Sequence, residues 1–171
     1  ENLRSGSVLA KGSFATVTLG SLRGRKVAIK SWHIQDVVAG EEVKHEHGLL
    51  QGLNHPRIVR VYGACLQPPL IILEWMPAGS LHHLLHEAQA KTPLTLATRA
   101  KMALQVCEGL DFLHGRAPPI VHRDLKSSNI LVDLCYDCKI CDLGLSQCLL
   151  TPMVTLPAAG SPLYFAPECF G

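Results

Sequence analysis

Residues 122–129 place a carboxylate, an ammonium group and an amide within one short loop, as Asp124, Lys126 and Asn129. A second carboxylate, Asp142, follows 18 residues after Asp124 and begins the tripeptide Asp-Leu-Gly on the next strand-like segment. Phosphoryl transfer from a nucleotide requires this set of groups. One carboxylate orients the incoming hydroxyl, a cation meets the charge of the moving phosphoryl group, and an amide with a second carboxylate holds magnesium.

The order of these residues resembles the catalytic loop H-R-D-x-K-x-x-N and the metal site D-F-G of eukaryotic protein kinases, and the resemblance runs from about Val8 to Glu168. It implies an α+β, two-lobed fold. The small lobe, residues 1–75, would be an antiparallel sheet plus one helix. The large lobe, from residue 76 to 171, would be mainly helical and would stop after the activation segment. Family domains run to about 250–300 residues, so we expect a partial domain, inactive alone and cut from a longer protein.

Alternating apolar and polar positions around glycines predict short antiparallel strands over residues 8–30. Residues 8–17 lie where the kinase glycine-rich loop, G-x-G-x-x-G-x-V, would be, although alanine replaces its first and third glycines at Ala10 and Ala15. Glycine suits such a loop because its amide approaches a phosphate without a Cβ in the way. The resemblance implies that ATP is bound by this loop and the next strand, at Leu9, Ala10, Lys11, Gly12, Ser13, Val17, Ala28 and Lys30.

A helix is predicted within residues 34–53, where Glu46 shares an apolar stripe with Val43 and Leu50. A carboxylate on an apolar face is costly unless it has a partner. Lys30 ends a predicted strand over residues 27–30 and resembles the family's phosphate-positioning lysine. We therefore expect Lys30 to pair with Glu46, and both residues are placed in the catalytic set.

Two strand-like runs, residues 58–62 and 70–73, follow the helix, and a turn at residues 77–80 starts a new helix. Residues 74–76, Glu-Trp-Met, lie between the second run and the turn and resemble the hinge of the family. The resemblance implies that adenine meets backbone groups of the hinge, an apolar residue that guards the back pocket, and one further apolar side chain: Glu74, Met76, Leu73 and Leu131.

The second half begins with a long helix at residues 96–114, which the apolar spacing predicts to be mostly buried through Leu96, Ala100, Met102, Ala103, Val106, Leu110 and Leu113. In the loop that follows, the resemblance assigns Asp124 as catalytic base and Lys126 as the group that stabilises the transferred phosphoryl. Asn129 and Asp142 would bind Mg²⁺, since oxygen ligands suit a hard cation. His122 is given a structural role beneath Leu143, which replaces the usual phenylalanine.

Arg123 precedes the catalytic aspartate, and in the family such an arginine meets a phosphate on the activation segment, here residues 142–168. Three hydroxyl side chains are candidates for that phosphate, and the sequence does not choose among them: Ser146, Thr151 and Thr155.

Substrate type is indicated by residues 160–168, whose Gly-Ser-x-x-Tyr form, with Lys126, is typical of serine/threonine kinases. Tyrosine kinases usually carry an Ala-Ala-Arg or Arg-Ala-Ala run and a tryptophan instead. Ser161 is expected to bond Asp124 and Lys126. The catalytic loop and hinge are similar to those of the tyrosine kinase-like group, which is mostly serine/threonine-specific; a tyrosine kinase is the weaker alternative.

Composition excludes several other functions. The net charge of +2 is too small to argue for nucleic acid, and no apolar run approaches the roughly 20 residues of a membrane span. Cys135, Cys138 and Cys141 are spaced like metal ligands, but two short strands around a turn would point residues three apart to opposite faces. We interpret all seven cysteines as thiols of an intracellular, cytoplasmic protein, with Cys141 an alkylatable residue of the nucleotide pocket.

The leading hypothesis is therefore an ATP- and Mg²⁺-dependent serine/threonine protein kinase. Its partners would be a protein substrate and either an upstream kinase or autophosphorylation of the activation segment. The second hypothesis is a pseudokinase scaffold that binds nucleotide weakly or not at all and acts through protein partners. Ala10 and Ala15 favour the scaffold, whereas the complete set of polar residues favours catalysis.

Overall fold

The computed structural model describes residues 3–33, 37–86, 94–148 and 160–167. Contacts divide the chain into two compact units. The first comprises Glu1–Asn54 with Val59–Trp75, and the second comprises His55–Ile58 with Met76–Gly171. No helix in the described part of the chain is both long and apolar enough to cross a membrane.

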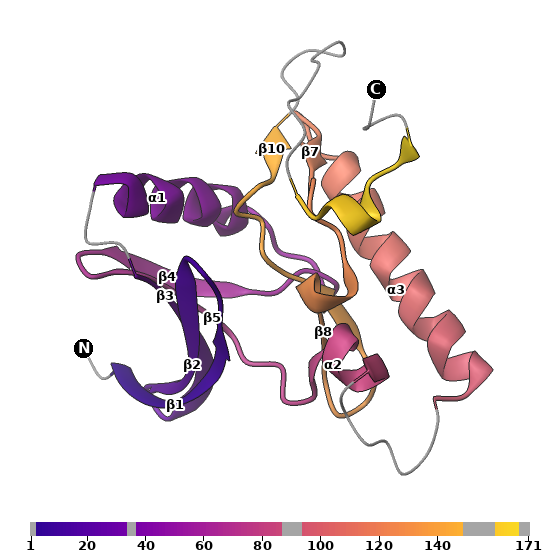
Figure 1. Cartoon of the computed structure of the whole chain (residues 1–171), viewed down its shortest axis with the longest axis horizontal. Coiled ribbons are helices and arrows are strands. Elements are labelled where there is room, and N and C mark those ends of the chain that lie inside the picture. The colour runs from indigo at the N-terminus through magenta and orange to yellow at the C-terminus, as the bar shows by residue number, and fades with distance from the viewer. Residues whose placement is uncertain (1–2, 34–36, 87–93, 149–159, 168–171) are drawn as a thin grey trace. The chain divides into compact units, whose positions relative to one another are not determined.

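The first unit is an antiparallel sheet with one helix, as predicted, and the sheet has five strands (Figure 1). Its strands lie in the order β1-β2-β3-β5-β4. The helix, α1, packs against β4 and β5. Their bounds are β1 Leu3–Lys11, β2 Ala15–Leu22, β3 Arg25–Trp32, α1 Val37–Gln51, β4 Val61–Leu66 and β5 Pro69–Glu74.

The core of this unit forms because the middle of β3 is covered on both sides. Val27, Ala28 and Ile29 are all buried, as are Val43 and Leu50 of α1. Burying one such side chain stabilises a fold by about 1.5–3 kcal/mol.

The register of the strands aligns several residues predicted to bind nucleotide. Val17 pairs with Lys30, and Ala28 pairs with Leu73. Directly opposed residues share a face, and so do residues two apart in one strand. Val17, Ala28, Lys30 and Leu73 therefore lie on one face of the sheet. This alignment is the main contribution of the fold to the site.

The strand predicted at residues 58–62 begins later, at Val61. Ile58 instead forms an isolated parallel bridge with Ile140, and both side chains are buried in the second unit. The apolar run from Ile58 to Tyr62 is thus divided between two cores. Periodicity along one segment does not reveal such a division.

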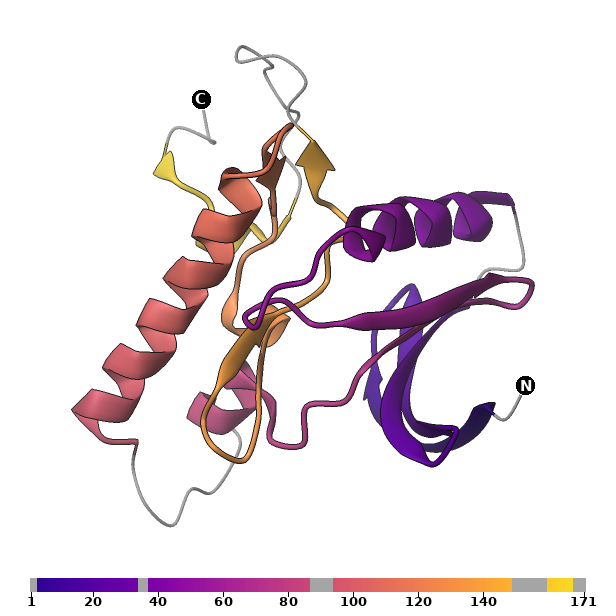
Figure 2. The same ribbon diagram turned by 180° about the vertical axis from the view of Figure 1, so that it is seen from behind.

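In its described part, the second unit combines two α-helices and two short 3-10 helices, η1 and η2, with short strands (Figure 2). A three-stranded sheet has the order β6-β8-β9, and β7 pairs with β10. The long helix α3 packs against β7 and β9. The bounds are β6 Gly79–Ser80, α2 Leu81–His86, α3 Leu96–His114, β7 Ile120–Val121, η1 Ser127–Asn129, β8 Ile130–Val132, β9 Cys138–Ile140, β10 Gln147–Cys148 and η2 Pro162–Tyr164.

Helix α3 has the predicted bounds, and Thr95 caps it by accepting a hydrogen bond from the amide of Thr98. The predicted extent of its burial was wrong. Of the seven apolar positions, only Met102 and Leu113 are buried. Gln105 and Gly109 complete the buried stripe, because they meet polar groups and backbone that hydrophobic spacing does not count. The other five positions are not buried. Leu96, Ala100 and Ala103 are exposed, and Val106 and Leu110 are partly exposed.

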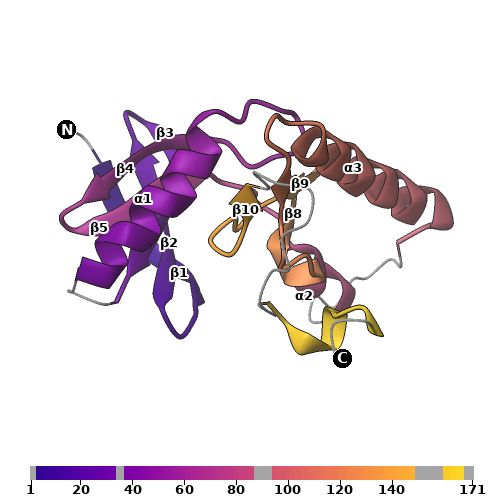
Figure 3. The same cartoon turned by 90° about the horizontal axis from the view of Figure 1, so that it is seen from above.

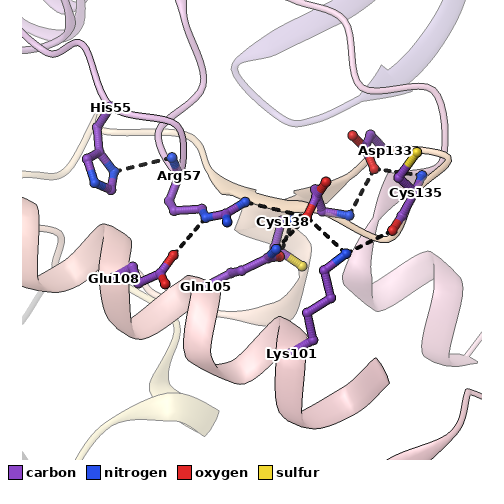
Figure 4. Close-up of polar contacts among 9 residues, drawn as sticks. His55, Arg57, Lys101, Gln105, Glu108, Asp133, Cys135 and Cys138 are labelled. Carbon is purple, nitrogen blue, oxygen red and sulfur yellow. Dashed lines mark hydrogen bonds and ion pairs between the residues drawn. The ribbon is translucent and has the colours of Figure 1, made fainter. Parts of the chain in front are cut away.

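A charged cluster joins α3 to the chain around Arg57 and to the β8–β9 turn (Figure 4). The Nε atom of Arg57 lies 2.8 Å from a carboxylate oxygen of Glu108, and its Nη1 lies 3.5 Å from Asp137. Asp137 also accepts hydrogen bonds from Lys101 and Gln105, and these lower the pKa of its carboxyl. The carbonyl of Arg57 accepts the amide of Ile140 at 2.8 Å. The cluster thus fixes three segments that are distant in sequence.

Gly109 lies at the closest approach in this cluster. A Cβ there would meet Ile140 Cδ1 at 2.8 Å and the Arg57 carbonyl oxygen at 3.1 Å, whereas a Cβ at Gly48 in α1 would meet nothing within 4 Å. We expect Gly109→Ala to lower the free energy of unfolding by about 1 kcal/mol despite its better helix propensity. Gly48→Ala should raise it by about 0.5–1 kcal/mol. Urea unfolding of both variants checks this, and equal effects would contradict the packing argument.

Candidate active site

Lys30 and Glu46 form the central ion pair of the first unit. Lys30 Nζ lies 2.7 Å from Glu46 Oε2, and the two side chains are 16% and 1% exposed. The helix supplies the carboxylate from the same buried stripe as Val43 and Leu50, and β3 supplies the ammonium. The predicted contact is therefore present. It places a cation on the face of the sheet that also carries Ala28.

Trp32 is a residue of this site that the sequence analysis missed. Its ring lies 4.9 Å from Lys30 Nζ, so the ammonium is held between a carboxylate and an aromatic face. Such a cation–π contact contributes about 0.5–2 kcal/mol when partly desolvated. The signal was available in strand periodicity, because a residue two positions after Lys30 in β3 must point to the same side.

The predicted nucleotide loop is the hairpin between β1 and β2. Ala10 pairs with Val17 and Lys11 with Thr16, after a register shift that flanks Leu9. The amide of Gly12 donates to the Ala15 carbonyl at 2.9 Å. A Cβ at Gly12 would make only an ordinary 3.4 Å contact with that carbonyl. Packing within the hairpin therefore does not require glycine at this position.

Asp124, Lys126 and Ser161 form a compact triad in the second unit. Lys126 Nζ lies 2.7 Å from Asp124 Oδ2, and it donates to Ser161 Oγ at 2.7 Å. Ser161 Oγ in turn donates to Asp124 Oδ1 at 2.8 Å. Burial would raise the pKa of Asp124, but hydrogen bonds from Lys126 and Ser161 outweigh it and lower that pKa. Asp124 is thus an ionised hydrogen-bond acceptor near neutral pH.

Asn129 presents an oxygen ligand because its amide nitrogen is otherwise engaged. That nitrogen donates to the Asp124 carbonyl at 2.9 Å and to its carboxylate at 3.1 Å. The amide oxygen remains as the atom that can meet a cation, which fits the oxygen chemistry of Mg²⁺. Asp142 adds a carboxylate and has a left-handed backbone, with φ of 63°. A non-glycine residue in this region is uncommon and is often associated with function.

His122 supports this loop from below. Its side chain is buried, Nδ1 accepts the amide of Asp124 at 3.3 Å, and Nε2 lies 2.9 Å from the Cys141 carbonyl. These partners fit a neutral ring with the proton on Nε2, and desolvation lowers the pKa of His122. The loop is thereby connected to the residue before Asp142. Leu143 is fully buried, and its predicted contact with His122 stays a prediction.

Arg123 donates to the side-chain oxygen of Gln147 at 3.1 Å and also has a left-handed backbone, with φ of 67°. Of the predicted phosphate acceptors, Ser146 is buried and donates to the His122 carbonyl at 3.1 Å. That burial argues against Ser146 as an acceptor. Thr151 and Thr155 lie outside the described residues.

Residues of the predicted hinge lie on both sides of the division between the units. In the first unit, the amide of Glu74 donates to the Arg60 carbonyl at 2.8 Å. In the second, the carbonyl of Met76 accepts the amide of Gly79 at 3.2 Å. Leu131 lies in β8 opposite Ser80. Their contacts with adenine stay predictions.

The cysteine spacing has a structural explanation. The Asp133 carboxylate accepts the amides of Cys135 and Asp137 at 2.8 Å each and so organises the turn between β8 and β9. Cys138 is buried and Cys135 is exposed. In the described part of the chain, no three His, Cys, Asp or Glu side chains are grouped as metal ligands.

Comparison with models of protein families identifies the family to which this chain belongs. The family model described as protein tyrosine and serine/threonine kinase matches residues 3–170. The chain belongs to this kinase family. The prediction of a protein kinase domain is thereby confirmed, and the structure agrees with the predicted antiparallel sheet and helix of its small lobe.

Several curated kinases resemble the chain over nearly its whole length. Serine/threonine-protein kinase CTR1 of Arabidopsis thaliana is 42% identical over 94% of this chain and 20% of its own. Probable serine/threonine-protein kinase drkB of Dictyostelium discoideum is 36% identical over 98% of this chain and 24% of its own. Dual specificity protein kinase shkC of the same organism is 38% identical, over 98% and 34%. The chain therefore spans about a fifth to a third of these relatives.

We predict an energetic coupling between Trp32 and Lys30. In a Glu46→Gln background, which removes the buried charge that Lys30→Met would leave unpaired, Trp32→Leu should cost more stability with Lys30 than with Met at that position. The difference, from urea unfolding, should be about 0.5–2 kcal/mol. Trp75→Leu is the control because the ring of Trp75 faces Lys26 instead. A coupling for Trp32 no larger than that for Trp75 would refute the contact.

Thiol reactivity should separate Cys138 from Cys135. Desolvation by burial raises the pKa of Cys138 to about 11, so about one thiol in a thousand is ionised at pH 8, and the thiolate is the nucleophile. Iodoacetamide at pH 8, followed by mass spectrometry, should label exposed Cys135 rapidly and Cys138 only after denaturation. Equal labelling rates in the native protein would show that the β8–β9 turn opens freely.

Proposed function

We propose that this chain is the catalytic part of a protein kinase that transfers the γ-phosphoryl group of ATP to serine and threonine hydroxyls of proteins. Family membership supports phosphoryl transfer in general. The observation that carries the proposal for this chain is the triad of Asp124, Lys126 and Ser161, which surrounds a hydroxyl group with the partners that the reaction needs.

The Ser161 hydroxyl shows how Asp124 and Lys126 would bind the hydroxyl of an acceptor residue. Its proton points to the Asp124 carboxylate, and its oxygen lies 2.7 Å from the Lys126 ammonium. An acceptor hydroxyl bound in the same manner would have its proton directed to Asp124 and its oxygen aligned for attack. The lowered pKa of Asp124 suits a group that orients the hydroxyl and receives its proton late. Lys126 would stabilise the negative charge of the transferred group.

The other polar residues fit the nucleotide and its metal. When bound, ATP supplies the phosphoryl group and Mg²⁺ neutralises its charge. From the first unit, Lys30 would bind phosphate oxygens while Glu46 and Trp32 hold its ammonium. From the second, the Asn129 amide oxygen and the Asp142 carboxylate would hold Mg²⁺. Packing within the hairpin would allow a Cβ at position 12. The glycine at that position is therefore better explained by close approach of a phosphate to the loop backbone, which supports a phosphate-binding loop.

Serine and threonine are favoured over tyrosine as acceptors. Lys126 and Ser161 bond each other in the pattern typical of serine/threonine kinases, and two of the relatives carry serine/threonine kinase in their names. We further propose that Arg123 binds a phosphate on Thr151 or Thr155, added by an upstream kinase or by autophosphorylation. The six described cysteines are free thiols, which supports an intracellular location.

A pseudokinase scaffold remains the second candidate. Ala10 and Ala15 replace two loop glycines, and the Gly12 amide is already bonded to the Ala15 carbonyl. A loop with fewer free amides holds phosphate less tightly. In that case the protein would act through partners, and the polar triad would have a structural role only.

The deciding test is phosphate transfer by the natural chain that carries residues 1–171, purified from bacteria and given radiolabelled ATP with Mg²⁺. We expect phosphoserine and phosphothreonine on the protein itself or on a general substrate. Asp142→Asn should lower the rate about 100-fold or more, because the negative charge of a proposed metal ligand is lost. Asp111→Asn, the same change at an exposed position on α3, should leave the rate unchanged.

Other results would change the proposal. Phosphotyrosine alone would contradict the assigned acceptor. ATP binding without transfer, or transfer that survives Asp142→Asn, would favour the scaffold or a contaminating kinase.

A further inference from the structure

His33 lies directly after β3, three residues beyond Lys30. The predicted nucleotide loop closes one end of the β1–β2 hairpin (Figure 3), and the pairing of β2 with β3 ends at Ala15 and Trp32. The amide of His33 continues this ladder by donating to the Phe14 carbonyl at 2.9 Å. The chain segment that carries Lys30 is thus bonded to the loop beyond the regular sheet.

The imidazole of His33 adds two contacts with the same loop. Its Nε2 lies 2.5 Å from Thr16 Oγ1, and its Nδ1 lies 3.4 Å from the Ser13 carbonyl oxygen. A carbonyl oxygen can only accept, so Nδ1 donates to Ser13, and a neutral ring then accepts the Thr16 hydroxyl at Nε2. One ring therefore spans the loop from Ser13 to Thr16.

The end of β3 meets the loop on both faces of the sheet. Directly opposed residues share a face, and so do residues two apart in one strand. Trp32, opposite Ala15, therefore lies on the face that carries Lys30. Thr16 follows Ala15 in β2 and lies on the other face, where it contacts the ring of His33. Movement of the loop away from β3 would separate pairs on both faces.

These contacts also orient the backbone of the loop. The carbonyl of Ser13 is directed at the His33 ring, which contacts the sheet on the face opposite to Lys30. In a trans peptide the N–H points away from the preceding C=O. The Phe14 amide therefore points away from the ring, toward the side of the sheet that carries Lys30. A phosphate bound by Lys30 would meet a donor there.

We propose that His33 is a positioning residue of the nucleotide site, which holds the loop on the strand of Lys30 with the Phe14 amide directed at a phosphate of ATP. Ordering a loop over a ligand costs conformational entropy, and a loop already anchored by His33 loses less of it. The anchor thereby offsets the replacement of two loop glycines by Ala10 and Ala15. This inference deepens the proposed function and rests on it.

The test is binding of a fluorescent ATP analogue, with Mg²⁺, to the natural chain that contains residues 1–171, beside transfer kinetics with ATP. His33→Ala should weaken binding about three- to tenfold, as expected for the loss of one or two hydrogen bonds. It should raise KM for ATP by a similar factor with little change in kcat. The melting temperature should not change, because His33 is exposed.

Partner variants assign the effect to the ring contacts. His33→Gln retains an amide group near the position of Nε2, so it should restore part of the affinity through Thr16. Thr16→Val should weaken binding in the unchanged protein but have little further effect in His33→Ala, because the contact is already lost. Thr18→Val is the matched control: Thr18 lies two residues further along β2 and contacts Ser5 instead, so its loss should leave nucleotide binding unchanged.

Two results would overturn the proposal. One is an unchanged nucleotide affinity in His33→Ala, and the other is an equal loss of affinity in Thr16→Val and Thr18→Val. If the unchanged protein binds no nucleotide, the proposed function fails separately. Hydrogen exchange then decides whether His33 holds the loop. Several-fold faster exchange of the amides of residues 12–16 in His33→Ala would support the anchor, and unchanged exchange would refute it.

Discussion

A buried carboxylate is the constraint on which the first unit depends. Glu46 is almost fully enclosed, and an isolated buried charge costs several kcal/mol. Lys30 neutralises it at 2.7 Å, and that requirement fixes how α1 packs on the sheet and which way the end of β3 faces. Trp32 then covers the ammonium. The cation that would bind phosphate is thus positioned by the same contacts that make the small lobe stable.

In the second unit, Asp124 and Lys126 form an ion pair, and the hydroxyl of Ser161 bonds both of them. Asp124 receives hydrogen bonds from Lys126, Ser161 and Asn129, which keep it ionised despite partial burial. The neutral ring of His122 joins this loop to the Cys141 carbonyl without adding a charge. Arg123 and Asp142 have left-handed backbones, as do Arg23 and Tyr136 in turns outside the site.

Local chemistry was readable from the sequence wherever one residue type determines its own surroundings. Glu46 on an apolar stripe predicted its partner, and Gly-Ser-x-x-Tyr predicted that Ser161 would bond Asp124 and Lys126. Prediction failed where one segment serves two cores, as at Ile58, and where polar groups or glycine occupy a buried stripe, as at Gln105 and Gly109. Apolar periodicity counts neither case. Ser146 was a plausible phosphate acceptor until its burial was known, because no sequence pattern reports that its hydroxyl bonds the His122 carbonyl.

The cysteine spacing shows why such patterns need their polar neighbours. Cys135 and Cys138 are three residues apart, as in many metal sites, yet the residues between and before them determine the geometry. The Asp133 carboxylate accepts hydrogen bonds from two amides of the turn. The Asp137 carboxylate accepts hydrogen bonds from Lys101 and Gln105 and forms an ion pair with Arg57. The Cys138 amide donates to the side-chain oxygen of Gln105 of α3 at 2.8 Å, and Cys138 is buried whereas Cys135 is exposed. Two carboxylates that accept from the turn amides and from α3 and Arg57 therefore account for the conformation of the turn.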